Sequence, residues 1–510
     1  MWNVRMYGLM VSFIVIFIVG EVNASGFFVA RFGGEHGHPT TDNPTAMYYN
    51  PAGLSLGAGT RLYLDGNFAW RSFTYDRDPA AIDNASNGTG MGETGFTPLG
   101  DGVRANSGEG SLTNFIAAPF VGVATDFGVK GLGIGLSFYA PFGGSSQYDQ
   151  GEDLAGFPGA KDGPQRWWAI EGTIRSVYIT TAAAYRIAPA RLSLGLSLNA
   201  VKSEVNTVRA RNLDGTDNLV EQAGQLEGRA LLNTSSWDLS VGAGLIWEPV
   251  DRLWFGVSYQ SAPGFGETEQ TGQAKLNFGR SNTDTVNVSL FQTLPDVYQA
   301  GVRWRSSDDW EFRLFGNYIR WSVFDSQCVL QEGLVNGRTQ NCEYEFDADR
   351  QATEDNPYVL GKPLVYIPRK WDDGFAVRAG TSYWFNPAVE VFGGAGYDSS
   401  AVPDETLEPA LFDTDKFTVS LGGRFTFLDD DLALGLTYTQ VIYMPREIDP
   451  RGRPCTDSSI ESGMCDVPSD QQRRSDVTAV GLRYQERQPD AAGKYTQAIG
   501  VLNINVQYTF

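Results

Sequence analysis

The sequence predicts an all-β protein: a transmembrane antiparallel β-barrel of about 14 strands with an N-terminal plug inside its lumen. Three observations predict it. Several segments alternate apolar and polar residues with a period of two, as strands with one apolar face do. The connections between them alternate between short turns and long polar segments. After residue 24 no apolar run is long enough to cross a bilayer as a helix, so strands are the remaining way across.

The composition of the 510-residue chain fits this fold and excludes some partners. Glycine occurs 59 times and aromatic residues make up 13% of the chain, which is typical of strands joined by tight turns. The chain has 39 Lys and Arg against 60 Asp and Glu, a formal charge of -21. No nucleic-acid partner is expected, because neutralising phosphates needs a basic surface.

Residues 1–24 are interpreted as a signal peptide. Arg5 precedes the apolar run "MYGLMVSFIVIFIVG", and Val22 and Ala24 supply the small residues of a signal-peptidase site. We therefore expect the mature chain to start at Ser25. The alternative is an N-terminal membrane anchor, which the short run disfavours, since a spanning helix needs about 20 residues.

The last ten residues form the clearest strand. In "VLNINVQYTF" apolar and polar residues alternate as far as the terminal Phe510. The same alternation recurs at 192–198, 237–247, 417–427 and 432–438. Tryptophans stand at both ends of the apolar row in 237–247, where the aromatic girdles of a membrane barrel would place them.

The order of the connections separates a barrel from a soluble β-sandwich. Short turns lie at 127–130, 188–191, 248–251, 385–388 and 428–431. Long polar segments lie near 76–110, 144–170, 208–232, 262–286, 326–370, 402–415 and 448–490. A sandwich has no reason to place every long loop at one end, whereas a transmembrane barrel does so. We expect the barrel to occupy residues 60–510.

The four cysteines form two local pairs in two of the long segments. Cys328 stands near Cys342, and Cys455 stands near Cys465. Both pairs are predicted to be disulfides, because the chain is expected to reach an oxidising compartment. A zinc site is the alternative, but the pairs are far apart in sequence and neither has CxxC spacing. The acidic segment 343–355 is interpreted as a solvated loop rather than a calcium site.

Residues 25–59 show no strand alternation and are too few for an independent domain, so we expect them to form the plug. Both histidines of the chain lie here, and Glu35, His36, His38 and Asp42 include the donors of a zinc site. We favour the alternative, polar plug residues that contact the lumen wall, and expect no metal or cofactor. Since the strands carry no histidine, they lack the usual base of an outer-membrane hydrolase, and no enzyme activity is expected.

Candidate ligand contacts come from the start of the mature chain and from strand positions whose parity points inward. They are aromatic, apolar or cationic, which suits a hydrophobic molecule that carries a carboxylate. The alternative is that they pack against the plug. The candidates are Phe27, Phe28, Trp254, Phe315, Ile319, Trp384, Phe392, Arg303 and Arg378, with Arg313 and Arg424 on the same inward face.

Short stretches spread over nearly all of the mature chain carry a family resemblance. They are "SGFF", "YYNPAGL" (48–54), "YAPFGG" (139–144), "FGVSYQS" (255–261), "LPDVYQAGVRW" (294–304), "PRKWDDGFAVRAG" (368–380), "GYDSSAVPDETL" (396–407) and the ending "GKYTQ…VQYTF". In this order they resemble FadL-type outer-membrane transporters for hydrophobic compounds. The stretch "GEHGHPTTD" departs from the family pattern.

The resemblance implies a fourteen-stranded barrel with an N-terminal hatch. The hatch motif of the family falls on Asn50, Pro51 and Ala52. The resemblance also implies a kink in the third strand that opens the wall sideways, so that a ligand leaves into the bilayer. This kink falls on Ala140, Pro141, Phe142, Gly143 and Gly144, where proline cannot donate to the ladder. The alternative is that the strand has simply reached its loop.

The function implied by the resemblance is passive uptake of long-chain fatty acids or similar lipids across the outer membrane of a Gram-negative bacterium. The protein would act as a monomer surrounded by outer-membrane lipid and lipopolysaccharide. The alternatives are a general or polar-solute channel and, less favoured, an outer-membrane enzyme or adhesin. The sequence does not specify which hydrophobic ligand is carried.

Overall fold

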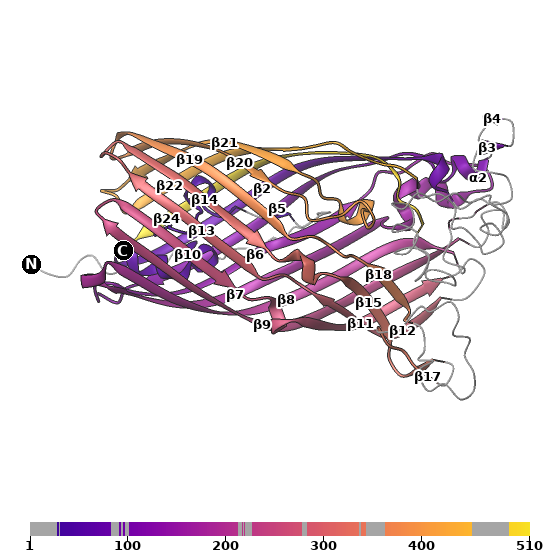
Figure 1. The fold of residues 1–510 in the computed structure, drawn as a ribbon, viewed down its shortest axis with the longest axis horizontal. Helices are drawn as coiled ribbons and strands as arrows, with labels where there is room; N and C mark the ends of the chain where they lie inside the picture. The colour runs from indigo at the N-terminus through magenta and orange to yellow at the C-terminus, as the bar shows by residue number, and fades with distance from the viewer. Residues whose placement is uncertain are drawn as a thin grey trace, which may run out of the picture.

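The computed structural model describes residues 28–29, 31–82, 91–92, 95–96, 101–212, 217, 219, 227–277, 283–335, 338–342, 363–450 and 489–510. Within these residues, fourteen antiparallel strands form a closed barrel (Figure 1). They are β2 (Thr60–Arg77), β5 (Gly108–Thr125), β6 (Leu132–Gln147), β7 (Glu171–Ile187), β8 (Leu192–Arg211), β9 (Gly228–Val250), β10 (Leu253–Gln260), β13 (Val297–Arg305), β14 (Trp310–Ile319), β19 (Gly374–Asn386), β20 (Val389–Asp398), β21 (Lys416–Phe427), β22 (Leu432–Tyr443) and β24 (Gly493–Thr509). The predicted antiparallel β-barrel of about 14 strands is confirmed.

The first and last wall strands close the barrel. Strand β24 pairs with β2 from Arg61↔Thr509 to Arg77↔Gly493, and the Phe510 N–H donates to the Thr60 carbonyl at 2.8 Å. The alternating segments predicted from the sequence lie in β8, β9, β21, β22 and β24. Their apolar residues face outward, because a membrane barrel exposes its apolar side to lipid.

Shorter strands extend the wall or lie in the long connections. β11 (Glu267–Asn277), β12 (Asp284–Thr293), β15 (Ser326–Gln331) and β18 (Val365–Pro368) continue one side of the wall, and β23 (Arg446–Ile448) pairs with β24. The others are β1 (Phe28–Val29), β3 (Met91–Gly92), β4 (Gly95–Phe96), β16 (Leu334–Val335) and β17 (Arg338–Thr339).

Helices are few and short. They are α1 (Ala46–Tyr49) and α2 (Asp101–Arg104), with the 3-10 helices η1 (Gly34–His36), η2 (Pro51–Leu56), η3 (Pro79–Ala81), η4 (Pro158–Asp162), η5 (Pro164–Trp167), η6 (Ala188–Ala190), η7 (Pro263–Phe265), η8 (Trp321–Val323) and η9 (Pro409–Leu411). In the part of the chain that the structure describes, no helix has the length and apolar character needed to cross a membrane.

The end of the barrel away from the C-terminus holds a buried aromatic cluster. It joins the outer ends of several strands to the connecting segments. Its largest members are Phe73, Tyr75, Trp167, Trp168, Trp321, Phe324, Trp371, Phe412 and Tyr495.

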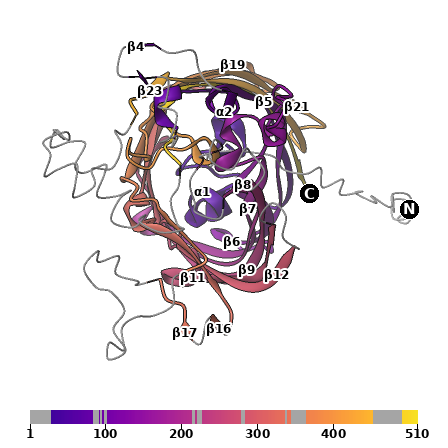
Figure 2. The ribbon, with the colours of Figure 1, turned by 90° about the vertical axis from the view of Figure 1, so that its right-hand side faces the viewer.

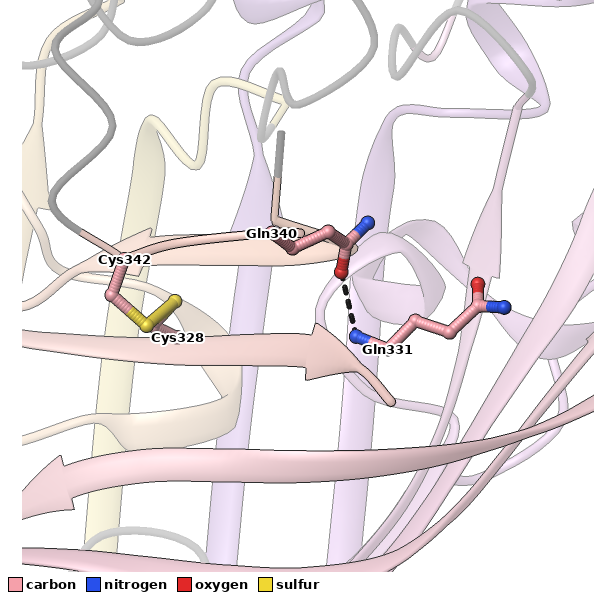
Figure 3. The surroundings of a disulfide bond; sticks show 4 residues. All are labelled: Cys328, Gln331, Gln340 and Cys342. Carbon is pink, nitrogen blue, oxygen red and sulfur yellow. Dashed lines mark hydrogen bonds between the residues drawn. A yellow bond between two sulfur atoms is a disulfide. The ribbon is translucent and has the colours of Figure 1, made fainter. Parts of the chain in front are cut away.

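One of the two predicted disulfides is present. Cys328, in β15, is bonded to Cys342, and nearby the Gln331 N–H donates to Gln340 Oε1 at 2.6 Å (Figure 3). The bond closes a local ring in a long connection. The second predicted pair, Cys455 and Cys465, lies outside the described residues, as do the signal peptide and the acidic segment 343–355.

Candidate functional site

Residues 31–59, here called the N-terminal segment, lie inside the ring of strands. The view along the barrel shows α1 surrounded by the wall (Figure 2). Helix η2 contacts β6, β7, β8 and β9. Almost every residue from Phe32 to Ser55 is buried. The segment therefore fills the lumen near the short-turn end.

Asn50 attaches this segment to the wall. Its side-chain Nδ2 donates to the carbonyls of Leu245 at 3.1 Å and Val257 at 3.2 Å, and also to Pro39 O at 2.8 Å. Its Oδ1 accepts from the Ala52 N–H at 3.1 Å, which caps η2. The fully buried amide thus binds the backbone of β9, β10 and its own segment.

Two glycines of the wall allow this close approach. A Cβ at Gly244 would lie 1.9 Å from Asn50 Oδ1, and a Cβ at Gly195 would lie 2.3 Å from the Ala52 nitrogen. Because real Cβ atoms do not approach so closely, any side chain at either position would push the Asn50–Ala52 turn away.

Ionisable side chains of the N-terminal segment contact the inner face of the barrel. Asp42 Oδ2 lies 3.1 Å from Arg303 Nη1, and the Asp42 carbonyl accepts a hydrogen bond from Arg61. His36 Nε2 lies 3.2 Å from Glu390 Oε1. These contacts come from β2, β13 and β20, so they hold the segment from several sides.

Glu35 is nearly fully buried between its own segment and β21. Its Oε1 accepts from Arg31 Nη1 at 3.0 Å and from the Ser420 hydroxyl. Burial opposes ionisation, but Arg31 and the Ser420 hydrogen bond outweigh it, so the pKa of the Glu35 carboxyl lies below its ordinary value. The charged carboxylate is the form that this arrangement stabilises.

His38 is buried as a neutral imidazole. Its Nδ1 accepts from the Thr40 N–H at 3.3 Å and lies 2.9 Å from Thr40 Oγ1. Burial, together with Arg313 and Arg303, holds the pKa of His38 well below its ordinary value. Among the described residues, no three or more His, Cys, Asp and Glu side chains are grouped so that they could hold a metal ion.

A first cavity, of about 130 Å³, lies between the N-terminal segment and the wall. Its lining is mainly apolar, with Ile319, Trp321 and Trp371 on one side and Val441 and Tyr443 among the residues opposite. Three cations also line it, and each is bound to a carboxylate: Arg31 to Glu35 at 3.0 Å, Arg378 to Asp398 at 2.7 Å and Lys416 to Asp413 at 2.6 Å.

A second cavity, of about 90 Å³, lies further toward the long connections. Leucine, valine and isoleucine side chains of β8, β9, β11, β12, β15 and β18 form most of its wall. Arg369 lines one end and binds Glu408 at 2.7 Å and Gln327 through two further hydrogen bonds. Both cavities therefore combine an apolar wall with cations, and Arg369 of the second cavity has an acidic partner, as the three cations of the first have.

The ladder between β5 and β6 stops part-way along the wall. The two strands pair from Thr125↔Ile134 to Phe120↔Tyr139 and then separate. Beyond a bulge after Tyr139, β6 continues along β7 as far as Gln147, without β5 on its other side. The separation, here called the β5–β6 split, falls where the sequence predicts the kink, and β1 pairs with β6 there, through Phe28↔Gly143.

An aromatic cluster lies on the lumen side at the base of the split. The rings of Phe120, Tyr139 and Tyr178 stack side by side, with centroids 5.5 and 5.4 Å apart. Phe32 and Tyr48 of the N-terminal segment pack against Tyr139 at 5.8 and 5.4 Å. The cluster is an apolar contact between the segment and the wall beside the split.

The structure places the predicted ligand contacts in three groups. Ile319 and Arg378 line the first cavity. Arg303, Phe315 and Phe392 contact the N-terminal segment, through Asp42, His38 and His36 respectively. Two tryptophans stack under arginines instead: Trp254 under Arg303 and Trp384 under Arg305.

The remaining predicted residues are placed less fully. Arg313 donates to Ser382 at 2.7 Å, and Arg424 is partly buried in β21. Phe27 lies outside the described residues, and Phe28 belongs to β1.

Several cavity residues are absent from the sequence-based candidates. Trp321 and Trp371 follow the ends of strands, where the period of two gives no information. Alternation along the strand could have indicated that Lys416 faces inward, because the next residue, Phe417, belongs to the apolar, outward-facing row.

Comparison with known proteins identifies the family. Residues 15–463 match the model of the outer membrane protein transport family (OMPP1/FadL/TodX). The chain belongs to this family. OMPP1/FadL/TodX proteins are transport proteins of the Gram-negative outer membrane for hydrophobic compounds, which confirms the predicted family, location and general class of function.

Individual relatives of this FadL-type chain are distant. The Escherichia coli O6:H1 long-chain fatty acid transport protein is 22% identical over 222 residues, or 41% of this chain; the match spans only 44% of that relative. A Pseudomonas aeruginosa FadL homologue has a TM-score of 0.65 at 16% identity, covering 96% of this chain and 98% of its own. The Ralstonia pickettii toluene transporter TbuX has a TM-score of 0.56 at 15% identity, covering 96% and 99%. Both of these solved structures have the same fold as this chain.

Proposed function

We propose that this protein takes up long-chain fatty acids or similar lipids by passive diffusion, through a plugged barrel with a lateral exit. The observation that carries the proposal is the pair of apolar cavities inside a barrel whose lumen is filled by the N-terminal segment. A polar-solute channel needs a continuous wet lumen, whereas an apolar ligand binds in enclosed apolar pockets.

The N-terminal segment acts as the plug in this proposal. Asn50, Asp42 and His36 attach it to four different wall strands, so it stays in the lumen while the ligand passes. Water and ions are excluded because the segment packs against the wall, including through backbone contacts at Gly195 and Gly244.

The ligand leaves through the β5–β6 split. The missing β5–β6 ladder supports this route, since β6 pairs there with the two residues of β1 and not with the neighbouring wall strand, whose hydrogen bonds would seal the barrel against lipid. The aromatic cluster of Phe32, Tyr48 and Tyr139 gives an apolar surface at the base of the split. A ligand that moves sideways here enters the bilayer without crossing the periplasmic end.

A second candidate is a neutral hydrophobic ligand, such as an aromatic hydrocarbon. It is favoured by one observation: each cation of the first cavity already binds a carboxylate. A fatty acid would have to share these cations with Glu35, Asp398 or Asp413, whereas a neutral molecule leaves the ion pairs intact.

Uptake in a Gram-negative host that lacks its own transporters of this class tests the proposal. Cells that produce the protein should take up labelled oleate several-fold faster than empty cells, and labelled toluene tests the second candidate in parallel. Planar-bilayer recordings should show little ion conductance. Porin-like conductance without uptake of either compound would establish a polar-solute channel instead. Mass spectrometry of the lipid that co-purifies with the protein identifies the ligand directly.

A further inference from the structure

Two cations stand on the outer face of the barrel beside the β5–β6 split. Arg175 of β7 is the ladder partner of Gly143, in the part of β6 that has left β5. The neighbours of Arg175 along β7, Ser176 and Tyr178, are buried and face the lumen, so by alternation Arg175 faces outward. Lys202 of β8 faces outward in the same way, between the buried Val201 and Ser203.

These cations lie at the level of the outer aromatic girdle. Lys202 is the ladder partner of Trp237, the tryptophan at the outer end of the apolar row of β9. Further along the wall, aromatic residues of neighbouring strands pack in a row at the same end: Tyr259, Tyr298, Tyr318, Phe375, Tyr397 and Phe417. On β7 and β8 the girdle is replaced by charge. Since aromatic girdles mark the head-group region, the cations face lipid head groups.

One carboxylate is shared between the two cations. Arg175 Nε and Lys202 Nζ bind the two oxygens of Glu204. The side chains of Arg175, Lys202 and Glu204 are 30%, 38% and 23% exposed. The trio keeps one net positive charge. Among the described residues, the two terminal amino groups of Arg175 donate no hydrogen bond, so they are available to an oxyanion.

An apolar groove lies inward of the cations on the same strands. It is a shallow hollow of about 600 Å³, open to the lipid side and lined mainly by Ile134, Leu136, Thr181, Ala183, Leu196 and Leu198. The small residues of β7 form its floor, and larger side chains of β6 and β8 form its sides. The groove begins on β7 at Thr181, six positions after Arg175 and roughly 20 Å along the strand, so an extended acyl chain that starts at Arg175 reaches the groove with its far end.

We propose that Arg175 and Lys202 bind the anionic head group of an amphiphile whose acyl chain runs over the outer face of β7 and ends in this groove. The oxyanion has two possible sources: the phosphate of lipid A in the outer leaflet, or the carboxylate of a fatty acid that leaves through the split. The second source rests on the proposed function, and the first does not. In either case the site places an anionic amphiphile at the lip of the lateral route.

Binding measured by native mass spectrometry in a neutral detergent tests the site. The probes are lipid A and oleate, added separately to the purified full-length barrel. The Arg175→Gln, Lys202→Gln double variant should bind lipid A about tenfold more weakly, or bind one oleate fewer per barrel. The matched control is Arg191→Gln, Arg252→Gln, which neutralises two exposed cations, each with an acidic partner, at the opposite end of the barrel.

The outcomes separate the two sources and can refute the site. Loss of lipid A binding alone identifies the phosphate, loss of one oleate alone identifies the carboxylate, and both losses identify a shared site. Unchanged binding of both probes, absence of binding by the unmodified protein, or equal losses in the control overturns the proposal. Glu204→Gln provides a check in the other direction: it frees both cations and should strengthen binding several-fold. Lipid A binding does not depend on transport. A failure of the proposed uptake can therefore be told apart from a failure of this binding site.

Discussion

Asn50 is fully buried and uses both ends of its side-chain amide. Its Nδ2 binds carbonyl oxygens of β9 and β10, while its Oδ1 caps η2 at Ala52. A shorter apolar side chain would leave these backbone groups buried without their partner, at a cost of about 1–3 kcal/mol. The Asn50 side chain by itself therefore connects the N-terminal segment to two wall strands.

Replacing Asn50 with Ala should therefore loosen the segment without unfolding the barrel. We expect higher ion conductance in planar bilayers and unchanged heat-modifiable gel mobility. Asn43→Ala is the matched control, because among the described residues the Asn43 side chain bonds only to Thr45, within its own segment. Gly244→Ala checks the same contact from the wall side, since its Cβ would displace the Asn50 amide. Conductance equal to that of the unmodified protein in both Asn50→Ala and Gly244→Ala would contradict this role.

His38 gives the closed state a dependence on pH. Burial and the nearby Arg313 and Arg303 lower its pKa in the folded state, so below about pH 6.5 a released segment takes up a proton that the buried one does not. The closed state should lose up to about 1.4 kcal/mol per pH unit as the pH falls from 6.5 toward the lowered pKa. The lowered pKa values of Glu35 and Asp42 act in the same direction, but only nearer their own ordinary values.

Conductance measured at about pH 7.5 and pH 5 checks this effect. It should rise at the lower pH in the unmodified protein and rise less in His38→Gln, which keeps an acceptor for Thr40 but has no titratable ring. An identical rise in both proteins would assign the pH dependence to other groups.

At the scale of the elements, β6 loses its pairing with β5 part-way along. A Gly143→Trp, Gly144→Trp double replacement fills the region beside the split. If the ligand leaves there, uptake of labelled oleate should fall about tenfold or more, while the pairing of Thr125 with Ile134 and the rest of the lower ladder stays intact. Leu421→Trp is the control, because it adds a tryptophan on the lipid face of β21, outside the groove and away from the split. A folded double variant that transports at the unmodified rate would exclude this exit.

The strands were predictable from sequence because their physical signal is local. A barrel strand needs only alternating apolar and polar residues, and 192–198 and 417–427 show this directly. Parity along β20 and β13 also indicated the inward face for Phe392 and Arg303, and both side chains are buried. The family resemblance added the position of the kink, where the ladder in fact separates.

The arrangement of the N-terminal segment was not predictable in the same way. It has no period, and its position depends on long-range contacts such as Asp42 with Arg303 and Asn50 with Leu245. The first cavity has the same origin, because Trp321 and Trp371 lie where strands have ended and parity no longer applies. Nothing local in the sequence indicates that these side chains meet.

For the molecule as a whole, the barrel wall should fold without the N-terminal segment. Deleting residues 31–56 leaves every wall strand and the β2–β24 ladder in place. The deleted barrel should fold, conduct ions and admit a small sugar in a liposome-swelling assay, because the lumen loses the segment that fills it. If it folds but stays closed to both, the aromatic cluster at the other end of the lumen seals the barrel by itself.

The pairing of β2 with β24 determines the order in which the barrel must be built. Thr74 and Thr496, hydrogen-bonded across this seam, are 422 positions apart, so the seam forms only after the last strand has been delivered. The N-terminal segment directly precedes β2 and ends up enclosed by a wall that it helps to begin. The N-terminal segment must therefore enter the lumen before β24 pairs with β2. Because this pairing joins residues so far apart in sequence, the closing step is expected to be slow.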